Sequence, residues 1–270
     1  MTRKPNVRKV LLDELGKIDA DRVAVLLSGG IDSASIMFAL LELGKQVTAY
    51  SFTLDGHMST DFSLARRNAK AFGVEFKPIL LPRDMQTLKR ELSALAMSGR
   101  AKSKTDFECG WPMLHAYGIA AEPVVVSGMG ADGHFCLSKK GMIHYRRDRI
   151  DEFRQGLYRS PGYAQAPLHH WLAAFFGRKA VMPYLSDAMR SEFLGTTWEE
   201  VNKPRQKQPI LDAFPRQFAR MKVLPHTNLQ LGDSRIAEHL AGLVGTDWNT
   251  RGAKSVVAIY NDLAAGRLRP

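Results

Sequence analysis

The sequence VAVLLSGGIDSASIMFALLELG, residues 23–44, places a glycine-rich turn between an apolar run and a helical pattern. Val23–Leu27 is continuously apolar, which is typical of a strand buried on both faces of a parallel sheet. Apolar residues recur at helical spacing over Ser33–Leu43, and Gly44 follows as a favourable helix terminator. The stretch Ser28-Gly29-Gly30-Ile31-Asp32-Ser33 therefore predicts a strand–loop–helix junction.

The residues of this junction predict an anion-binding site. Gly29 and Gly30 let the backbone approach a ligand closely, and the amides at the start of a helix carry partial positive charge. Phosphate is the usual anion at such a place, and Ser28 and Ser33 add hydroxyl donors. Asp32 would repel phosphate unless a cation lay between them, so it predicts Mg²⁺. The alternative, a plain turn with a helix cap, does not explain six consecutive residues of this kind.

Strand and helix patterns alternate through the first half of the chain. Strands are expected at 23–27, 46–54, 74–81 and 123–126, and helices at 33–43, 61–72, 83–98 and 111–121. This alternation predicts an α/β fold with a parallel sheet covered by helices. The second half reads as helices at 148–159, 167–176, 185–194, 208–220, 233–244 and 253–264. We expect an α/β core at residues 1–140 and a C-terminal helical substrate lobe at 141–270, packed on it as one unit.

The composition and net charge of the chain limit the kinds of binding partner that we expect for it. The chain is 45% hydrophobic with a net charge of +11, which suits phosphate handling and leaves nucleic acid as a minority expectation. No apolar run reaches the roughly 18 residues of a membrane span, and the N-terminus has no apolar signal core. A cytoplasmic protein without a membrane partner is therefore expected. Cys109 and Cys136 lack the CxxC spacing of a zinc site, and a disulfide framework is not expected.

The SGGxDS segment resembles the pyrophosphate loop of the N-type ATP pyrophosphatases, also called PP-loop enzymes. The resemblance implies an adenine nucleotide alpha hydrolase-like core that binds ATP and Mg²⁺. It also implies cleavage of ATP between the α- and β-phosphates, with adenylation of a substrate oxygen.

A second segment, VVVSGMGADGHF at residues 124–135, resembles the SGxGxDE segment of asparagine synthetases. It is another buried strand that runs into a glycine-rich turn at Gly128. Asp32 and Asp132, at two strand ends, would then hold one Mg²⁺–pyrophosphate between them. A second tight loop in which Asp132 caps a helix is the alternative.

Two further segments resemble the synthetase domain of asparagine and β-lactam synthetases. They are RKAVMPYLSDAMRSEFL at 178–194 and KQPILDAFPRQFARMK at 207–222. In that family a lysine contacts the phosphates and stabilises the adenylation transition state. The resemblance assigns this role to Lys222, with Lys207 as the alternative phosphate-binding lysine. It also implies adenine contacts around Ser51-Phe52-Thr53.

The chain departs from that family at several positions. SGGIDS begins at residue 28, so we expect no glutaminase domain, and the nitrogen must come from free ammonia, a separate donor protein or an amine substrate. Met129 stands where the family has a glutamate or, in the β-lactam branch, a tyrosine. Methionine cannot accept a proton, so the acid–base arrangement must differ. His134 and Glu108 are candidate substrate contacts, and His134 is a candidate base.

These features predict an AMP-forming C–N ligase. A carboxylate of a small molecule or peptide attacks the α-phosphorus of ATP, and ammonia or an amine then releases AMP. An amide or base carbonyl is the less favoured acceptor. Two alternatives stay open: adenylation of a nucleobase in DNA or RNA, and a non-catalytic ATP-binding partner subunit.

Overall fold

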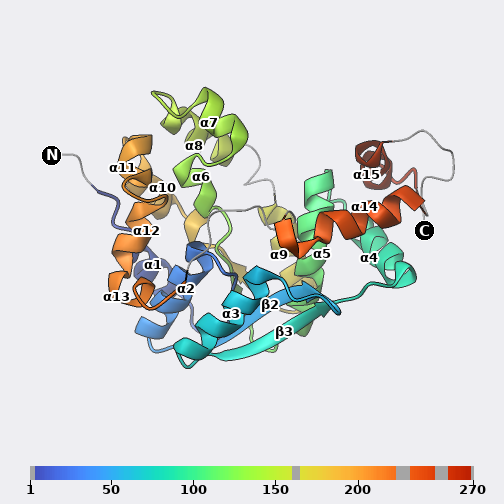
Figure 1. The fold of residues 1–270 in the computed structure, drawn as a ribbon, viewed down its shortest axis with the longest axis horizontal. Coiled ribbons are helices and arrows are strands. Elements are labelled where there is room, and N and C mark those ends of the chain that lie inside the picture. Colours follow the sequence, from blue (N-terminus) through green and yellow to red (C-terminus); the bar gives the residue numbers. More distant parts are fainter. Residues whose placement is uncertain (1–3, 160–164, 223–231, 247–254, 269–270) are drawn as a thin grey trace.

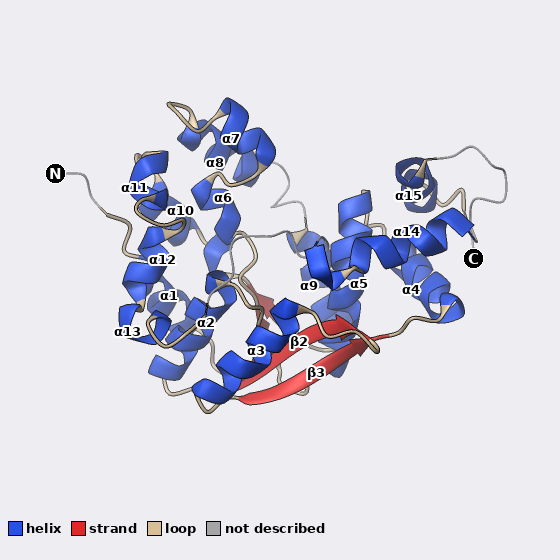
Figure 2. Cartoon of the chain, viewed as in Figure 1, coloured by secondary structure: helices blue, strands red, loops and turns tan. Residues whose placement is uncertain are grey.

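The computed structural model describes residues 4–159, 165–222, 232–246 and 255–268. Within these ranges the strands form a five-stranded parallel sheet in the order β3-β2-β1-β4-β5, partly visible in Figures 1 and 2. The strands are β1 Arg22–Leu26, β2 Gln46–Leu54, β3 Glu75–Leu81, β4 Val124–Val126 and β5 Lys179–Val181. The chain leaves β1 in one direction for β2 and β3, and returns to its other side for β4 and β5. The carboxyl ends of β1 and β4 therefore flank a topological switch point, where α/β sheets bind ligands.

Helices cover both faces of the sheet. In the first half they are α1 Val7–Gly16, α2 Ile31–Glu42, α3 Thr60–Ala71, α4 Met85–Met97, α5 Lys104–Ile119 and α6 Ala131–Phe135. In the second half they are α7 Lys139–His144, α8 Ile150–Arg159, α9 Ala166–Phe175, α10 Asp187–Phe193, α11 Trp198–Asn202, α12 Gln208–Ala213, α13 Pro215–Phe218, α14 Ile236–Thr246 and α15 Val256–Ala264. Two short 3₁₀ turns, η1 Pro183–Leu185 and η2 Gly232–Ser234, complete the described elements. None of the described helices has the length and apolar character required to cross a membrane.

Strand β1 explains why the sheet has two hydrophobic cores. Successive side chains of a strand point to opposite faces. Val23 and Val25 enter a cluster with α1, α2 and α10–α13, whereas Ala24 enters a second cluster with α4, α5, α9, α14 and α15. All three residues are fully buried, so the continuous apolar run follows from burial on both faces. The prediction of a parallel α/β sheet is confirmed.

The second half of the chain is distributed over both faces of the sheet. Helices α10–α13 lie beside α1 and α2 at the left of Figure 1, and α9, α14 and α15 lie beside α4 and α5 at the right. Strand β5, from the expected helical lobe, pairs with β4 in the sheet. The expected division at residue 140 therefore does not separate a sheet from a helical lobe.

Local chemistry accounts for the helix boundaries that the sequence pattern misplaced. Helix α5 begins at Lys104, seven residues before the expected start, because Ser103 and Asp106 form a reciprocal capping box. The expected helix at 208–220 is divided into α12 and α13, since Pro215 has no N–H with which to continue α12. Helix α1 and the three-residue strand β5 were not predicted.

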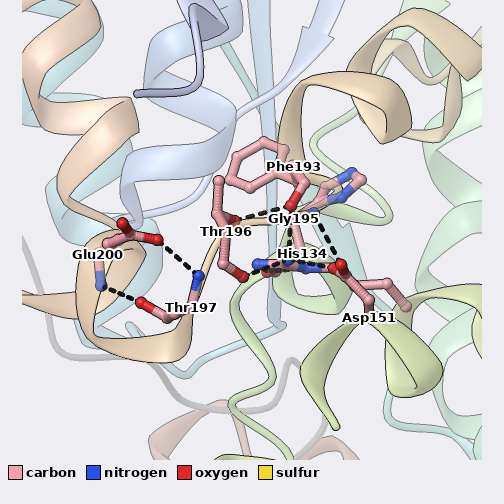
Figure 3. Close-up of polar contacts among 8 residues, drawn as sticks. His134, Asp151, Phe193, Gly195, Thr196, Thr197 and Glu200 are labelled. Carbon is pink, nitrogen blue, oxygen red and sulfur yellow. Dashed lines mark hydrogen bonds and ion pairs between the residues drawn. The ribbon is translucent and has the colours of Figure 1, made fainter. Parts of the chain in front are cut away.

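A buried arginine holds the segment after β4 against α8 and α10. Arg154 is fully buried and donates to the carbonyl oxygens of His134 at 2.8 and 2.9 Å, Phe193 at 2.5 Å and Thr196 at 2.9 Å. Figure 3 shows these acceptors, with Asp151 accepting from the Gly195 amide at 2.7 Å. Because these carbonyls lie on α6 and on the turn that ends α10, the guanidinium fixes the position of α6 relative to α10.

Candidate functional site

The first loop of the site lies between β1 and α2 and is organised by its two serines. The Ser33 hydroxyl accepts from the Ser28 amide at 3.0 Å and lies 3.1 Å from the Ser28 hydroxyl. The Gly30 amide donates to Ser28 Oγ at 3.1 Å. Helix α2 begins at Ile31 without a side-chain hydrogen bond from its N-cap, Gly30. The two hydroxyls thus shape the loop, and the first turn of α2 presents its amides toward the end of the sheet, as an anion site requires.

The second loop follows β4 and packs directly on the first. A Cβ atom at Gly128 would lie 3.1 Å from Cβ of Asp32 and 3.1 Å from the Ser33 nitrogen. Two loops can approach this closely only because residue 128 has no side chain. Gly130 lies in the left-handed region with a φ of 92°, at the start of α6. The two strand ends therefore form one continuous surface, with Asp32 on α2 and Asp132 on α6.

Lys207 joins the two loops. Its Nζ lies 2.5 Å from Oδ2 of Asp32 and 2.5 Å from Oδ1 of Asp132, and its side chain is 5% exposed. Lys207 is the N-cap of α12 and has a left-handed φ of 59°. Its backbone amide donates to Oδ1 of Asn202 at 3.3 Å. Burial lowers the pKa of Lys207, but the two carboxylates raise it by more, so the lysine stays charged.

A cavity of about 840 Å³ opens at these loops. Of the predicted ligand-binding and substrate residues, those lining it are Ser28, Gly30, Asp32, Ser33, Ser51, Phe52, Gly128, Met129, Asp132 and Lys207. Gly29 belongs to the first loop, and its amide donates to Oδ1 of Asp61 at 3.2 Å. Burial raises the pKa of Asp61, which also lines the cavity. The structure thus brings together both predicted loops and the end of β2.

Other predicted residues lie elsewhere. Lys222 is exposed after α13 and is not among the cavity-lining residues. Thr53 is buried and donates to the carbonyl of His57 at 2.6 Å. Glu108 is 1% exposed, pairs with Lys104 at 2.9 Å and is not among the cavity-lining residues. The structure therefore does not place Thr53, Glu108 or Lys222 with the loop residues.

His134 differs most from its expected place. It is fully buried, its ring stacks on Phe193 at 4.5 Å, and its Nε2 lies 2.7 Å from the carbonyl oxygen of Tyr184. Burial lowers the pKa of His134 to about 3, so the ring is neutral and its Nε2–H donates to that carbonyl. His134 is a packing residue of α6 and does not line the cavity, which corrects the expectation of a base or a substrate contact.

Two helical stripes in the cavity wall were missed. Thr105, Cys109 and Met113 line it from α5, and Gln165 and His169 line it from the start of α9. Each set has a spacing of four residues, which places its members on one helix face. The spacing could have revealed both stripes, whereas the predicted Glu108 lies one position from the residues of α5 that line the cavity.

The buried histidines predict a stability that depends on pH. Burial lowers the pKa of His169 to about 4, and His134 is affected more strongly. Because the unfolded rings bind protons below about pH 6.5 and the folded rings do not, stability is retained above that pH and is lost as pH falls toward 4. Lowering the pH from 7 to 5 is expected to decrease the free energy of unfolding by about 2 kcal/mol for each ring.

Chemical denaturation at both pH values measures this effect. His134→Gln removes one titrating group and is expected to remove its contribution of about 2 kcal/mol from the pH dependence. His144→Gln, at an exposed histidine of α7, is the matched control and is expected to leave the dependence unchanged. An unchanged dependence in His134→Gln contradicts this account of the buried ring.

The carboxylates fit Mg²⁺ only when phosphate completes the coordination. Within the described residues, no group of three or more histidine, cysteine or acidic side chains forms a metal site. Asp32 and Asp132 nevertheless converge on one point, because both lie 2.5 Å from the same nitrogen. Mg²⁺ is commonly held by one or two carboxylates together with substrate phosphates. The donor set therefore fits a magnesium ion that is shared with a bound nucleotide.

The parallel sheet, the two glycine loops at the switch point and the cavity between them define an α/β protein of the ATP pyrophosphatase, or PP-loop, type. The chain belongs to the asparagine synthase family, which matches residues 16–244. Proteins of this type are enzymes that use ATP. The predicted relationship to this superfamily is confirmed.

Individual proteins match this chain over only part of its length. A segment of 59 residues is 39% identical to a 7-cyano-7-deazaguanine synthase of Desulfatibacillum aliphaticivorans, covering 22% of this chain and 25% of that protein. A segment of 151 residues is 28% identical to the tRNA-specific 2-thiouridylase MnmA of Fervidobacterium nodosum, covering 47% of this chain and 41% of that protein. The chain thus matches less than half the length of either relative.

Solved structures show weak overall similarity. The NMN synthetase of Francisella tularensis superposes with a TM-score of 0.36 at 16% identity, over 85% of this chain and 100% of that one. The U34-tRNA thiolase NcsA of Methanococcus maripaludis, solved with its [4Fe-4S] cluster, has a TM-score of 0.36 at 12% identity, over 96% of this chain and 75% of that one.

Proposed function

We propose that this protein is an AMP-forming ligase that adenylates an acceptor oxygen and transfers the activated group to a nitrogen nucleophile. The observation that carries the proposal is the convergence of Asp32 and Asp132 on Lys207 at the switch point of the sheet. Family membership supports the use of ATP. The acceptor oxygen belongs to a carboxylate or to an amide or base carbonyl, the two classes that the sequence left open.

The cavity suggests how ATP is oriented. The triphosphate lies at the β1 loop and the first turn of α2, where amides and the Ser28 and Ser33 hydroxyls can donate to it. The adenine lies toward the end of β2, where Ser51 and Phe52 line the same cavity. Mg²⁺ held by Asp32 and Asp132 would neutralise the charge that collects on pyrophosphate as it leaves. These groups suit charge stabilisation rather than proton transfer.

Lys207 supplies the fixed positive charge of this arrangement. In the structure it neutralises two carboxylates that would otherwise repel each other across a short distance. With nucleotide bound, the same ammonium lies within reach of phosphate oxygens at the loop. A preorganised charge in a buried site stabilises a transition state without reorganisation, and here it acts as negative charge moves onto pyrophosphate.

ATP–pyrophosphate exchange tests the proposal. Wild-type protein with Mg²⁺ is compared with Asp32→Ala over pools of amino acids, other carboxylic acids, amides, nucleosides and nucleic acid. Exchange that requires one pool and is lost in Asp32→Ala is the expected result. No exchange with any pool, despite measurable ATP binding, contradicts the proposal and favours a non-catalytic ATP-binding subunit.

A second candidate function is adenylation of a base within nucleic acid. Two observations favour it: the net charge of +11 and the partial similarity to a tRNA thiouridylase. Binding to RNA that weakens steeply with salt is expected if this function is correct. Absence of binding at physiological salt contradicts it.

A further inference from the structure

The cavity wall also includes residues of α5 and of the start of α9, which are elements other than the phosphate loops. We call this part of the cavity the α5–α9 chamber and define it by the cavity-lining residues Thr105, Cys109, Met113, Gln165 and His169. The two helices lie side by side in Figure 1. Gly110 allows this approach, since a Cβ at that position would lie 2.6 Å from Cδ2 of Leu168. The chamber therefore results from the close packing of these two helices.

None of the five side chains that define the chamber is charged, and the charges that act on Cys109 from beside it are those of two buried carboxylates, Glu108 and Asp106. Burial raises the pKa of the Cys109 thiol to about 11, so it stays protonated, and it lowers the pKa of His169 to about 4, so that ring stays neutral. The charged residues that line the rest of the cavity are Asp32, Asp61, Asp132, Arg205 and Lys207, and they lie on other elements. Burial of a carboxylate or an ammonium group without a partner is strongly unfavourable. The chamber thus disfavours an acceptor that presents a carboxylate to it.

The chamber nevertheless offers directed hydrogen bonds. The Tyr117 hydroxyl lies 3.1 Å from Nδ1 of His169, and burial raises the pKa of Tyr117, so the phenol keeps its proton. In the His169 tautomer in which Tyr117 donates to Nδ1, the proton of the neutral ring lies on Nε2, as a donor on a side chain that lines the cavity. The Gln165 amide hydrogen-bonds the Cys109 thiol and retains further donor and acceptor capacity, and Thr105 adds a hydroxyl. Met113 and Cys109 supply apolar surface beside these groups.

We propose that the α5–α9 chamber binds an uncharged acceptor through an amide or lactam carbonyl, rather than a carboxylate. The paired donor and acceptor groups of Gln165, with the donor of His169, match the C(=O)–N–H edge of such a molecule. A cavity of about 840 Å³ is near the upper end of the range for a site that takes one small ligand, which leaves room for nucleotide and acceptor together.

The inference rests on the proposed adenylation for its chemistry. The carbonyl oxygen forms a bond to the α-phosphorus while the bond from that phosphorus to the bridging oxygen of pyrophosphate breaks. The N–H proton of the acceptor is released to solvent, which yields an O-adenylated imidate and pyrophosphate. A nitrogen nucleophile then adds to the imidate carbon, and the former carbonyl oxygen leaves with AMP.

Matched pairs of acceptors test the inference. Each pair joins a carboxylic acid and its neutral amide, and a separate set contains nucleosides with and without a lactam carbonyl. Binding to the full chain is measured by ligand-observed NMR with Mg²⁺ and α,β-methylene-ATP, and activation by ATP–pyrophosphate exchange. Short RNA is a further arm, which distinguishes a free lactam from a base carried in nucleic acid.

Two variants separate the chamber from the rest of the protein. Gln165→Glu adds a negative charge at nearly constant size and is expected to weaken binding of the neutral acceptor at least tenfold, while ATP affinity is unchanged. Gln86→Glu makes the same substitution at an exposed position of α4 and is expected to change neither quantity. Thermal unfolding of both variants verifies that they are folded.

The outcomes are distinguishable. Neutral acceptors that bind and support exchange, with no response from their carboxylate partners, support both proposals. Exchange with carboxylates alone overturns the chamber inference and leaves the adenylation proposal standing. Binding of neutral acceptors without exchange supports the chamber and contradicts adenylation. Binding of neutral acceptors that is equal in wild type and Gln165→Glu overturns the assignment of the chamber.

Discussion

Lys207→Met is expected to lower the rate of ATP–pyrophosphate exchange by about 10²–10³-fold, the usual effect of removing one preorganised electrostatic group. Lys207 is 4% exposed and its ammonium lies between Asp32 and Asp132. Methionine preserves most of the side-chain volume but removes the charge. The two carboxylates then face each other and the incoming phosphates without this cation, so both ATP binding and the chemical step are weakened.

Steady-state exchange and calorimetric titration with Mg–ATP measure the two effects. Lys203→Met is the matched control, because Lys203 is exposed on the same segment before α12. Exchange in Lys207→Met within threefold of wild type would contradict the role of this lysine. A loss of the same size in Lys203→Met would show that the segment, rather than the ammonium at the loops, is responsible.

The same assay distinguishes the contribution of Lys207 from that of Lys222. The role of Lys222 in the transition state stays a prediction from family resemblance. Lys222 is exposed in this structure and directly precedes a segment outside the described residues. A lysine that acts only in the transition state reduces the rate and leaves the affinity for ATP unchanged. Lys222→Met with that pattern supports the predicted role, and an unchanged rate contradicts it.

Gly130→Ala is expected to destabilise the protein by about 2–5 kcal/mol, from two additive causes. Gly130 has a φ of 92°, which is unfavourable for any residue with a side chain. A Cβ there would also lie 2.1 Å from Cδ2 and 2.8 Å from Cγ of Leu185, so Leu185 must move. Chemical denaturation measures the change in the free energy of unfolding.

Gly44→Ala separates the two causes. Gly44 has a φ of 72°, but nothing lies within 4 Å of the place that a Cβ would occupy. Its substitution is expected to cost only the backbone strain, about 1–2 kcal/mol. Equal destabilisation in the two variants would contradict the claim that Leu185 is packed against the β4 loop. Because Gly130 also lines the cavity two residues before Asp132, reduced exchange is expected in Gly130→Ala alone.

The residues of the sheet could be predicted because their burial leaves a direct pattern in the sequence. Strand β2 has the predicted bounds. Strands β1, β3 and β4 begin one residue away from their predicted starts, and β1 also ends one residue away from its predicted end. The two loops could be placed at the site from the parallel topology, since the carboxyl ends of adjacent strands meet. Strand β5 was missed because three residues are too few to show a period.

The rest of the site depends on contacts between distant segments, which no local pattern records. Lys207 is 175 residues from Asp32 in the chain, and its contact with Asp32 depends on the position of α12. His134 follows the β4 loop closely, yet α6 turns its ring into the core against Phe193. Family resemblance pointed to both segments, whereas the direction of each side chain follows only from packing.

The acceptor preference illustrates the same limit. The sequence favoured a carboxylate through its resemblance to asparagine synthetases. The uncharged stripes on α5 and α9 become one chamber only when Gly110 brings the two helices together. The proposed preference for an uncharged acceptor therefore depends on the packed structure, and the pattern of a single helix could not reveal it.

Oxygen transfer is the most direct test of the central claim that an acceptor oxygen attacks the α-phosphorus of ATP. The acceptor identified by exchange is labelled with oxygen-18 at its reactive oxygen, and the products of turnover are examined by phosphorus NMR and mass spectrometry. The account predicts AMP and pyrophosphate in equal amounts, with one labelled oxygen in the AMP. Formation of ADP and phosphate, or AMP without label, would contradict it.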